Sequence, residues 1–272
     1  MTHDVQAIGR KFEVKGTYRD AEPFGAGHIN DTYRARYIDD QTGRDYLLQR
    51  INHHVFKSPE KVMENMQKVT AHLWNKLCDT GEQDPSRRCL RLIPMADGKF
   101  LYRDSDGNYW RTMDCISGVE TFDRVEKPEQ AFQAALAFGH FQRLLLDFPA
   151  TDLHDTIPDF HNTRRRFERF LEVLDADPAD RASQIPEEVR FIKEHELEAS
   201  RLLDLQDSGE LPLRVTHNDT KLNNVLFDGE TGEGICVVDL DTVMPGLSLY
   251  DFGDLVRTAA TTAAEDERDL NK

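Results

Sequence analysis

Residues 216–227 read Thr-His-Asn-Asp-Thr-Lys-Leu-Asn-Asn-Val-Leu-Phe and form the most informative stretch of the chain. They contain the pattern His-x-Asp-x-x-x-x-Asn, which leads directly into an apolar strand pattern. Phosphoryl transfer needs a carboxylate that orients the attacking hydroxyl and accepts its proton, and a nearby oxygen ligand for Mg²⁺. Asp219 suits the first task and Asn224 the second. The stretch therefore predicts a loop that carries phosphotransferase chemistry.

A second acid, Asp239, follows at the end of the apolar run Val237-Val238. The glycine-rich turn at 228–234 predicts a hairpin, which brings Asp239 back beside Asn224. A carboxylate there can bridge the metal and the phosphates of a nucleotide. Taken singly, a His-x-Asp is more often a turn, and an acid that ends a strand is usually a helix cap. Two acids and an Asn in this order favour the catalytic interpretation.

The rest of the chain divides into a strand-rich part and a helical part. Strand patterns occur at residues 12–19, 29–38, 46–51, 90–95, 100–102 and 109–113, with a hairpin turn at 39–43. One helix interrupts them, with Ser58 as its cap, Pro59 at its first position and an apolar face formed by Val62, Met66, Val69 and Leu73. After about residue 118, helical patterns occur at 130–146, 162–174 and 187–205 and from about 250. This order predicts an α+β fold with two lobes, an antiparallel-sheet N-lobe and a mostly helical C-lobe.

The composition limits the possible partners. The chain has 272 residues, a formal net charge of −16 and a pI near 5.0. Such a surface repels nucleic acid and anionic membranes, so we expect neither as a partner, and bound phosphate must be held by local groups and a metal. We find no signal-peptide pattern and no apolar run of transmembrane length. The four cysteines lack metal-site spacing and are typical of reduced thiols, so we expect a cytoplasmic protein.

The motifs resemble those of the aminoglycoside phosphotransferase and choline kinase superfamily, whose members are distant relatives of protein kinases. The segments 217–224, 239–246 and 25–33 are most similar to those of bacterial N-acetylhexosamine 1-kinases. The resemblance implies a protein-kinase-like fold, ATP and Mg²⁺ as cofactors, Asp219 as catalytic base, and Asn224 and Asp239 as metal ligands. It also implies a sugar substrate, N-acetylglucosamine or N-acetylgalactosamine, which is phosphorylated on its anomeric hydroxyl.

The same resemblance implies where the lobes divide. Residues 1–113 correspond to the nucleotide-binding N-lobe, 114–118 to a hinge, and 119–272 to the catalytic and substrate-binding C-lobe. In the hinge, the backbone of Asp114, Cys115 and Ile116 is expected to meet the adenine edge.

The nucleotide side of the site has weaker signals. Gly25 and Gly27 lie between two strand patterns, where a glycine hairpin can cover phosphates with backbone N–H groups. His28 and Asn30 are expected to contact phosphate or substrate, although ordinary polar strand residues are an equal alternative. The third strand offers no Lys, so we assign the phosphate-binding cation to Arg50. If the strand register is shifted by one residue, Gln49 points inward instead.

The literal sequence Asp251-Phe252-Gly253 spells the magnesium motif of protein kinases, but it lies twelve residues after Asp239. We therefore expect Asp251 to cap the following helix and to brace the catalytic loop. The helix that opens near this residue has no stop signal before Lys272, and the resembling kinases continue with further helices. We accordingly expect the chain to be incomplete at its C-terminus and to expose an apolar face.

Alternative functions remain open at this point. An aminoglycoside, choline or homoserine kinase would use the same loop with a different acceptor. A pseudokinase that binds nucleotide without turnover is the alternative from another class. The three intact residues Asp219, Asn224 and Asp239 argue against it, and the missing lysine argues for it.

Overall fold

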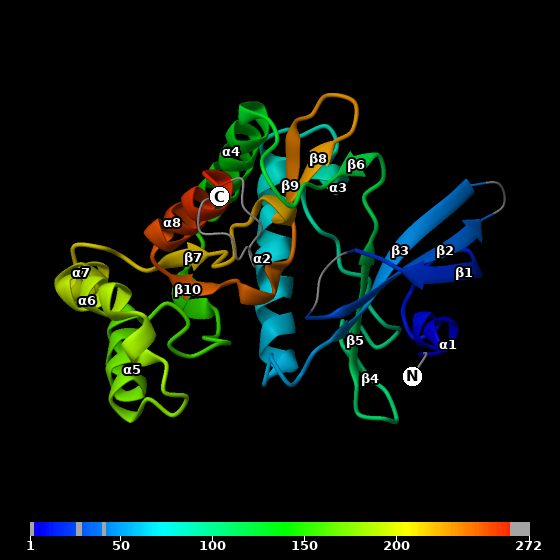
Figure 1. The fold of residues 1–272 in the computed structure, drawn as a ribbon. Coiled ribbons are helices and arrows are strands. Elements are labelled where there is room, and N and C mark those ends of the chain that lie inside the picture. The colour runs from blue at the N-terminus through cyan, green and yellow to red at the C-terminus, as the bar shows by residue number, and fades with distance from the viewer. Residues whose placement is uncertain (1–2, 26–28, 40–41, 262–272) are drawn as a thin grey trace.

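The structure is a computed structural model that describes residues 3–25, 29–39 and 42–261. Its N-terminal part is a five-stranded antiparallel sheet with the strand order β1-β2-β3-β5-β4 (Figure 1). The strands are β1 (Thr17–Pro23), β2 (Asp31–Asp39), β3 (Thr42–Ile51), β4 (Tyr102–Arg103) and β5 (Tyr109–Asp114). Strands β2 and β3 form the predicted hairpin, with Asp39 opposite Thr42.

The two faces of this sheet have different partners, because side chains alternate along a strand. On one face, Leu48 and Trp110 are buried in a small core with helix α1 (Val5–Gly9). On the other face, Met113 joins the main core with helix α2 (Pro59–Asp79). Consequently, successive residues of β3 or β5 point alternately toward α1 and toward α2.

Helix α2 begins where the sequence predicts it, with Ser58 as the N-cap residue, although the Ser58 side chain makes no capping hydrogen bond. All four residues of the predicted apolar face are buried: Val62, Met66, Val69 and Leu73. Because this face packs into the main core, α2 lies between the sheet and the C-terminal part of the molecule (Figure 1).

The C-terminal part surrounds two small sheets, one with the order β6-β8-β9 and one that pairs β10 with β7. Its helices are α4 (Pro128–Leu144), α5 (Thr163–Ala176), α6 (Pro186–Glu194), α7 (Glu196–Asp207) and α8 (Ser248–Ala259), whereas the short α3 (Pro85–Arg88) follows α2 in the N-terminal part of the chain. Its strands are β6 (Val119–Glu120), β7 (Arg214–Thr216), β8 (Val225–Asp228), β9 (Gly234–Val237) and β10 (Met244–Gly246). Short 3₁₀ turns are η1 (Ala150–Asp152), η2 (Ala182–Gln184), η3 (Leu222–Asn224) and η4 (Leu240–Thr242).

One apolar core joins both parts of the molecule. Met66 of α2, Phe138 of α4 and Val225 of β8 all belong to it. The arrangement of an antiparallel sheet followed by a mostly helical part confirms the predicted α+β fold. None of the described helices combines the length and the hydropathy that crossing a bilayer requires.

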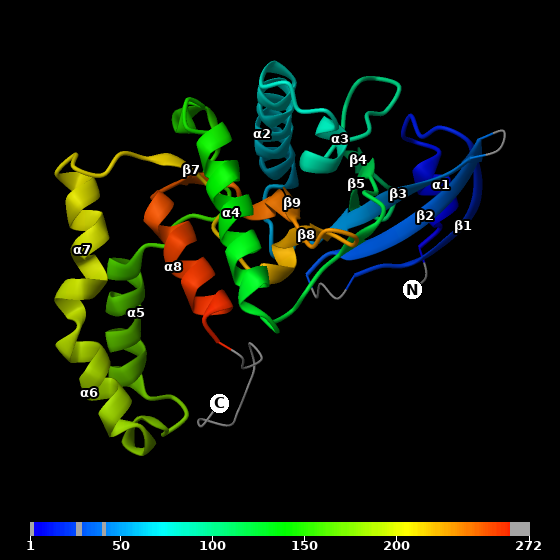
Figure 2. The ribbon, with the colours of Figure 1, turned by 90° about the horizontal axis from the view of Figure 1, so that it is seen from above.

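Helices α5, α6 and α7 lie to one side of this core (Figure 2). None of their residues is buried. The structure corrects the single helix predicted at 187–205, because the helical run is broken at His195. The His195 Nδ1 atom hydrogen bonds to the carbonyl of Phe191 at 2.8 Å, a local side-chain contact that competes with the helical ladder.

Two strand predictions were also wrong. The strand predicted at 12–19 begins only at Thr17, because Gly16 has a φ of +93° and its backbone lies close to Ile38. The strand predicted at 90–95 is reduced to isolated bridges, one of them between Leu92 and Met113. Pro94 lacks the N–H that a ladder needs, which accounts for the interruption.

Candidate active site

The loop between β7 and β8 holds the central residues of the candidate site. His217 is buried, and its Nε2 atom lies 2.9 Å from the carbonyl oxygen of Val238. The Nδ1 atom accepts a hydrogen bond from the backbone N–H of Asp219 at 3.3 Å. A carbonyl can only accept, so the ring proton lies on Nε2. His217 therefore fixes the backbone of Asp219 and ties it to the strand that precedes Asp239.

Helix α8 stabilises this loop through side-chain hydrogen bonds to its backbone. The buried Asp251 carboxylate accepts hydrogen bonds from the N–H groups of His217 (2.9 Å) and Asn218 (2.8 Å) and from Gln142 (3.0 Å). This confirms the predicted bracing role. The predicted capping role was wrong, because α8 begins at Ser248 and Asp251 lies inside its first turn.

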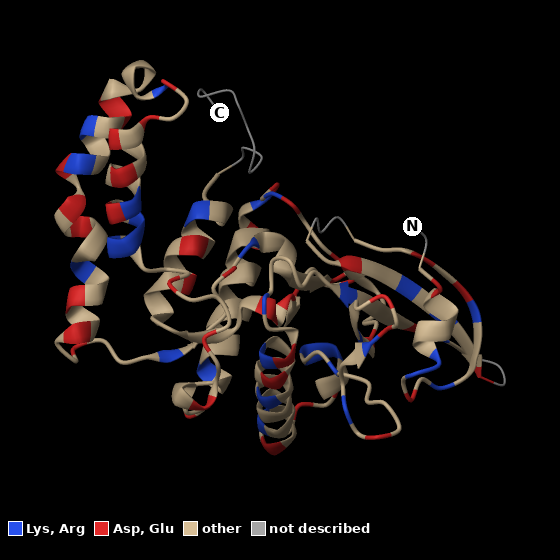
Figure 3. Cartoon of the chain, turned by 90° about the horizontal axis from the view of Figure 1, so that it is seen from below, with Lys and Arg blue, Asp and Glu red and all other residues tan. Residues whose placement is uncertain are grey.

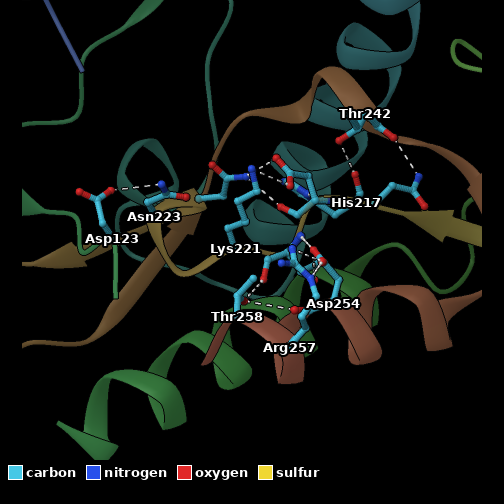
Figure 4. A network of polar contacts seen from close by, with 12 residues as sticks. Asp123, His217, Lys221, Asn223, Thr242, Asp254, Arg257 and Thr258 are labelled. Atoms are coloured by element: carbon cyan, nitrogen blue, oxygen red, sulfur yellow. Dashed lines mark hydrogen bonds and ion pairs between the residues drawn. The ribbon is translucent and has the colours of Figure 1, made fainter. Parts of the chain in front are cut away.

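A second group of contacts extends the brace. The Thr220 N–H donates to Asp254 at 2.7 Å, and the Thr220 hydroxyl donates to the carbonyl of Asp251 at 2.7 Å. On the opposite side, the Thr242 hydroxyl donates to the carbonyl of His217 at 2.7 Å. Figure 4 shows this network, with Thr242 on one side of His217 and Asp254 on the other. The catalytic loop is thus held by α8 and by the segment that follows Asp239.

The Asp219 carboxylate lies at the open side of the loop, with 27% of its side-chain surface exposed. The amide nitrogen of Asn224 donates to its Oδ2 atom at 3.1 Å and to the Asp219 carbonyl at 2.8 Å. The Lys221 ammonium lies 3.4 Å from Oδ1. The carboxylate is therefore oriented by its neighbours and still accessible.

The β8–β9 hairpin brings Asp239 to Asn224, as the sequence predicts. The Val238 N–H donates to the Asn224 carbonyl at 2.9 Å. Asp239 itself has left-handed backbone angles (φ 60°, ψ 59°), which turn the chain away from β9. Its side chain remains accessible to solvent although the surrounding protein is dense. Desolvation, and then the negative charge of Asp241, raise the pKa of the Asp239 carboxyl to about 6.

These residues fit a magnesium ion. With the amide nitrogen of Asn224 bound to Asp219, its amide oxygen is the atom suited to a cation, and Asp239 supplies a solvent-accessible carboxylate. Mg²⁺ prefers oxygen ligands and is commonly held by one or two protein groups together with phosphates and water. No cluster of three or more His, Cys, Asp or Glu suited to a metal occurs in the described ranges.

Strand β10 joins the segment after Asp239 to the strand that leads into the catalytic loop. Met244 pairs with Thr216, whose hydroxyl donates to the Met244 carbonyl at 3.0 Å. Gly246 makes this pairing possible, because a Cβ at that position would lie 2.3 Å from the Thr216 hydroxyl oxygen.

Arg50, the predicted phosphate-binding cation of the third strand, points away from the C-terminal part. Arg50 is opposite Trp110 and pairs with Asp31 (Nε–Oδ2 2.7 Å), so it lies on the sheet face that packs against α1. Gln49 points to the other face, toward α2 and the C-terminal part. The geometry thus corrects the assignment of Arg50 in favour of the alternative register, in which Gln49 faces inward.

The cation on the inward face is Arg111 of β5, which the sequence reasoning did not select. It is opposite Gln49 in the ladder, is 1% exposed and forms an ion pair with Asp241. An arginine in the middle of the apolar strand pattern 109–113 was the available signal, since such a buried charge requires a partner.

The remaining predicted residues have varied surroundings. Gly25 has a φ of +83°, whereas Gly27 and His28 lie outside the described residues. Both ends of the Asn30 amide are engaged, since it donates to Asp241 at 2.7 Å and accepts from the Asn52 N–H at 2.9 Å. Asn30 therefore has a clear structural role.

The backbone N–H groups at the end of β5 and just after it are paired in part. The N–H groups of Asp114 and Cys115 donate to the carbonyls of Arg91 (3.0 Å) and Asp45 (3.2 Å). The Ile116 N–H has no backbone partner among the described residues. It can therefore serve a ligand, as can the N–H groups of Ser117 and Gly118, which also have no backbone partner among the described residues.

An aromatic group lies beside the catalytic loop. The His161 Nε2 atom is 3.4 Å from the Asn218 carbonyl, and its ring centroid is 4.9 Å from that of Tyr250 and 4.7 Å from that of Phe160. Burial lowers the pKa of His161. The next residue, Asn162, caps α5 by accepting from the Arg165 N–H at 3.1 Å.

Comparison with solved structures identifies the fold. Aminoglycoside 2′-phosphotransferase-IIIa in its GDP complex is 11% identical, with a TM-score of 0.56 over 89% of this chain and 73% of its own. Aminoglycoside phosphotransferase APH(3″)-Id from Streptomyces rimosus, in complex with ADP and streptomycin, is 17% identical, with a TM-score of 0.52 over 97% of this chain and 84% of its own. Ethanolamine kinase from Plasmodium vivax is 15% identical, with a TM-score of 0.50 over 87% of this chain and 61% of its own. At these identities the likeness shows the fold alone, and it confirms the predicted kinase-like arrangement.

The family is shown by a sequence model. The model of the phosphotransferase enzyme family matches residues 20–271, which is nearly the whole chain and includes the catalytic loop and Asp239. The chain therefore belongs to the phosphotransferase enzyme family.

Proposed function

We propose that this phosphotransferase moves the γ-phosphate of ATP to a sugar, specifically to the anomeric hydroxyl of N-acetylglucosamine or N-acetylgalactosamine. The observation that carries the proposal is the Asp219 carboxylate, which is accessible and yet oriented by Asn224 and Lys221. A carboxylate held in this way can orient an acceptor hydroxyl and take its proton.

The nucleotide is assigned to the space between the two parts of the chain. Residues 1–113 form the nucleotide-binding lobe, 114–118 the hinge and 119–272 the catalytic lobe. Asp114, Cys115 and Ile116 meet the adenine edge, and the available N–H of Ile116 supports this assignment. Gly25 and Gly27 cover the phosphates. Two of the similar structures contain ADP or GDP, which supports a nucleotide ligand here.

Asn224 and Asp239 are the residues that would hold Mg²⁺. A bound Mg²⁺ neutralises charge on the nucleotide phosphates. The protein contributes position: Asp219 aligns the acceptor, and the contacts to His217 and Asp251 keep the loop from moving as the hydroxyl loses its proton.

The choice of sugar rests on the resemblance of segments 25–33, 217–224 and 239–246 to the N-acetylhexosamine kinases. The aromatic group of Phe160, His161 and Tyr250 supports it, because ring faces beside the base can pack against a sugar ring. Asn30 and His28 stay assigned to phosphate or substrate contact, and the hydrogen bond of Asn30 to Asp241 supports this for Asn30.

The deciding experiment measures ADP release from Mg·ATP with a panel of acceptors. We expect turnover with N-acetylglucosamine or N-acetylgalactosamine and none with the methyl glycoside of either, in which the anomeric oxygen is blocked. Phosphorus NMR of the product should show phosphate coupled to the anomeric proton.

The panel also separates the alternatives. Turnover only with streptomycin, ethanolamine, choline or homoserine would replace the sugar by that acceptor and keep the phosphotransferase assignment. Tight Mg·ADP binding without turnover on any acceptor would identify a pseudokinase.

A further inference from the structure

Arg111 is a cation enclosed in an acidic protein. Its Nε atom donates to the Gln49 amide oxygen at 2.8 Å, and a second nitrogen reaches the same oxygen. Its Nη1 atom donates to the Asp241 carboxylate and lies 3.5 Å from the sulfur of Met66. With 1% of its surface exposed, Arg111 has no open path to a ligand in this structure.

The contacts continue on both sides of this ion pair. The second carboxylate oxygen of Asp241 accepts from Asn30, and the Gln49 amide nitrogen donates to the Thr32 hydroxyl at 2.8 Å. The resulting network joins strands β2, β3 and β5 to η4, in which Asp241 lies two residues after Asp239.

The ion pair is exceptional within the described part of the chain, where it alone has both side chains only 2% exposed. Burying two charges costs about as much free energy as their attraction returns, so an apolar pair of similar volume would stabilise the fold as well. The pair is therefore better explained by the position that it imposes than by the stability that it adds.

We infer that Arg111 is a positioning residue for phosphoryl transfer, which acts through Asp241 to fix Asp239 against the sheet that covers the nucleotide. The inference rests on the proposed role of Asp239 as a metal ligand. Protein kinases carry a lysine on the third strand that pairs with an acid on the next helix. Here Gln49 has that inward position, and the cation comes from its ladder neighbour Arg111.

The test replaces both partners by apolar residues of similar size, Arg111→Met with Asp241→Leu, so that no unpaired charge is left buried. The matched control is Arg88→Met with Glu233→Leu, which removes an ion pair of 2.8 Å between α3 and the far end of the β8–β9 hairpin. For each protein we would measure the melting temperature, ADP affinity with and without Mg²⁺, and turnover.

The inference predicts a double variant that remains folded and binds metal-free ADP as well as the parent does. Its melting temperature should fall, because Gln49 loses its donor and Asn30 its acceptor. The Mg²⁺ concentration that gives half-maximal enhancement of ADP binding, which we call the Mg²⁺ requirement, should rise by at least about tenfold. This is the size of effect seen for other residues that orient metal ligands. The control should keep the parent's Mg²⁺ requirement. A folded double variant with an unchanged Mg²⁺ requirement would overturn the inference.

A milder variant provides a second test in case the double variant does not fold. Gln49→Met removes the acceptor that aligns the guanidinium but leaves both charges paired, so it should fold and should still raise the Mg²⁺ requirement severalfold. If it leaves that requirement unchanged while the double variant fails to fold, Arg111 is a structural residue only. The binding measurements need no acceptor. If the parent binds Mg·ADP but shows no turnover, the proposed function is refuted, and the binding data of the variants still test the role of Arg111.

Discussion

The catalytic loop and the helices α5–α7 are both rich in polar residues, but the two regions use them in opposite ways. In the loop and at the end of β7 that leads into it, Thr216, His217 and Thr220 have no exposed surface, and each has hydrogen-bond partners within the protein. In α5–α7 no residue is buried, and ion pairs such as Arg164 with Asp204 lie at the surface. Figure 3 shows acidic and basic residues distributed along these helices.

The difference shows that burial, rather than residue type, decides what a polar side chain does. A buried polar group is costly unless it is paired, so a fully paired cluster has one favoured geometry. A surface ion pair is screened by water and contributes little. We therefore expect substitutions in the loop to change chemistry or stability strongly and equivalent substitutions in α5–α7 to change neither.

The largest effect is expected for Asp219→Asn. The amide keeps the size of the side chain and cannot accept the hydroxyl proton, so turnover should fall by at least about a hundredfold. ADP affinity should remain close to the parent value, which calorimetry can measure. Near-parent turnover would remove Asp219 from the role of base.

The second largest effect is expected for Asp251→Ala, which should lower the stability of the fold. The change leaves the N–H groups of His217 and Asn218 without an acceptor in a buried position. Since each unsatisfied group costs about 1–3 kcal/mol, the free energy of unfolding in urea should fall by about 3 kcal/mol. If it is unchanged, the loop is held by its other contacts, and the contrast between the two regions is smaller than we infer.

A moderate effect is expected from pH. Because the pKa of Asp239 is raised to about 6, the metal-free protein should lose stability as the pH rises from the ordinary carboxyl value of about 4 toward 6. A metal ligand must be deprotonated, so Mg·ADP binding should strengthen over the same range. We expect affinity to be about tenfold weaker at pH 5 than at pH 7. Asp239→Asn should abolish this dependence.

The smallest effect is expected for Arg164→Ala in α5. Its hydrogen bonds to Asp207 and Asp204 hold its pKa above the usual range, and its partners are largely exposed. The free energy of unfolding should change by less than about 0.5 kcal/mol, and turnover should be unaffected. A large loss of activity would place α5–α7 in the acceptor site and break the comparison.

The sequence predicted the features that depend on neighbouring residues. The spacing of Asp219 and Asn224 and the hairpin that leads to Asp239 are local patterns, and the structure brings these residues together. The apolar face of α2 was predictable for the same reason.

The features that depend on distant contacts were not predictable. The importance of Arg111 comes from Asp241, which lies 130 residues further along the chain. The choice between Gln49 and Arg50 depends on strand parity, which a one-residue shift reverses. The break at His195 coincides with a side-chain contact to the Phe191 carbonyl, which periodicity does not reveal.

Gly246 has a consequence for anyone who maps this protein by saturation mutagenesis. Even the methyl group of alanine would displace the Thr216 hydroxyl, which hydrogen bonds to the Met244 carbonyl. A screen scored by activity alone would rank position 246 beside Asp219, although its backbone only lets two strands approach. A parallel screen for protein abundance would separate the two, since variants at 246 should be depleted in both and variants of Asp219 in the activity screen alone.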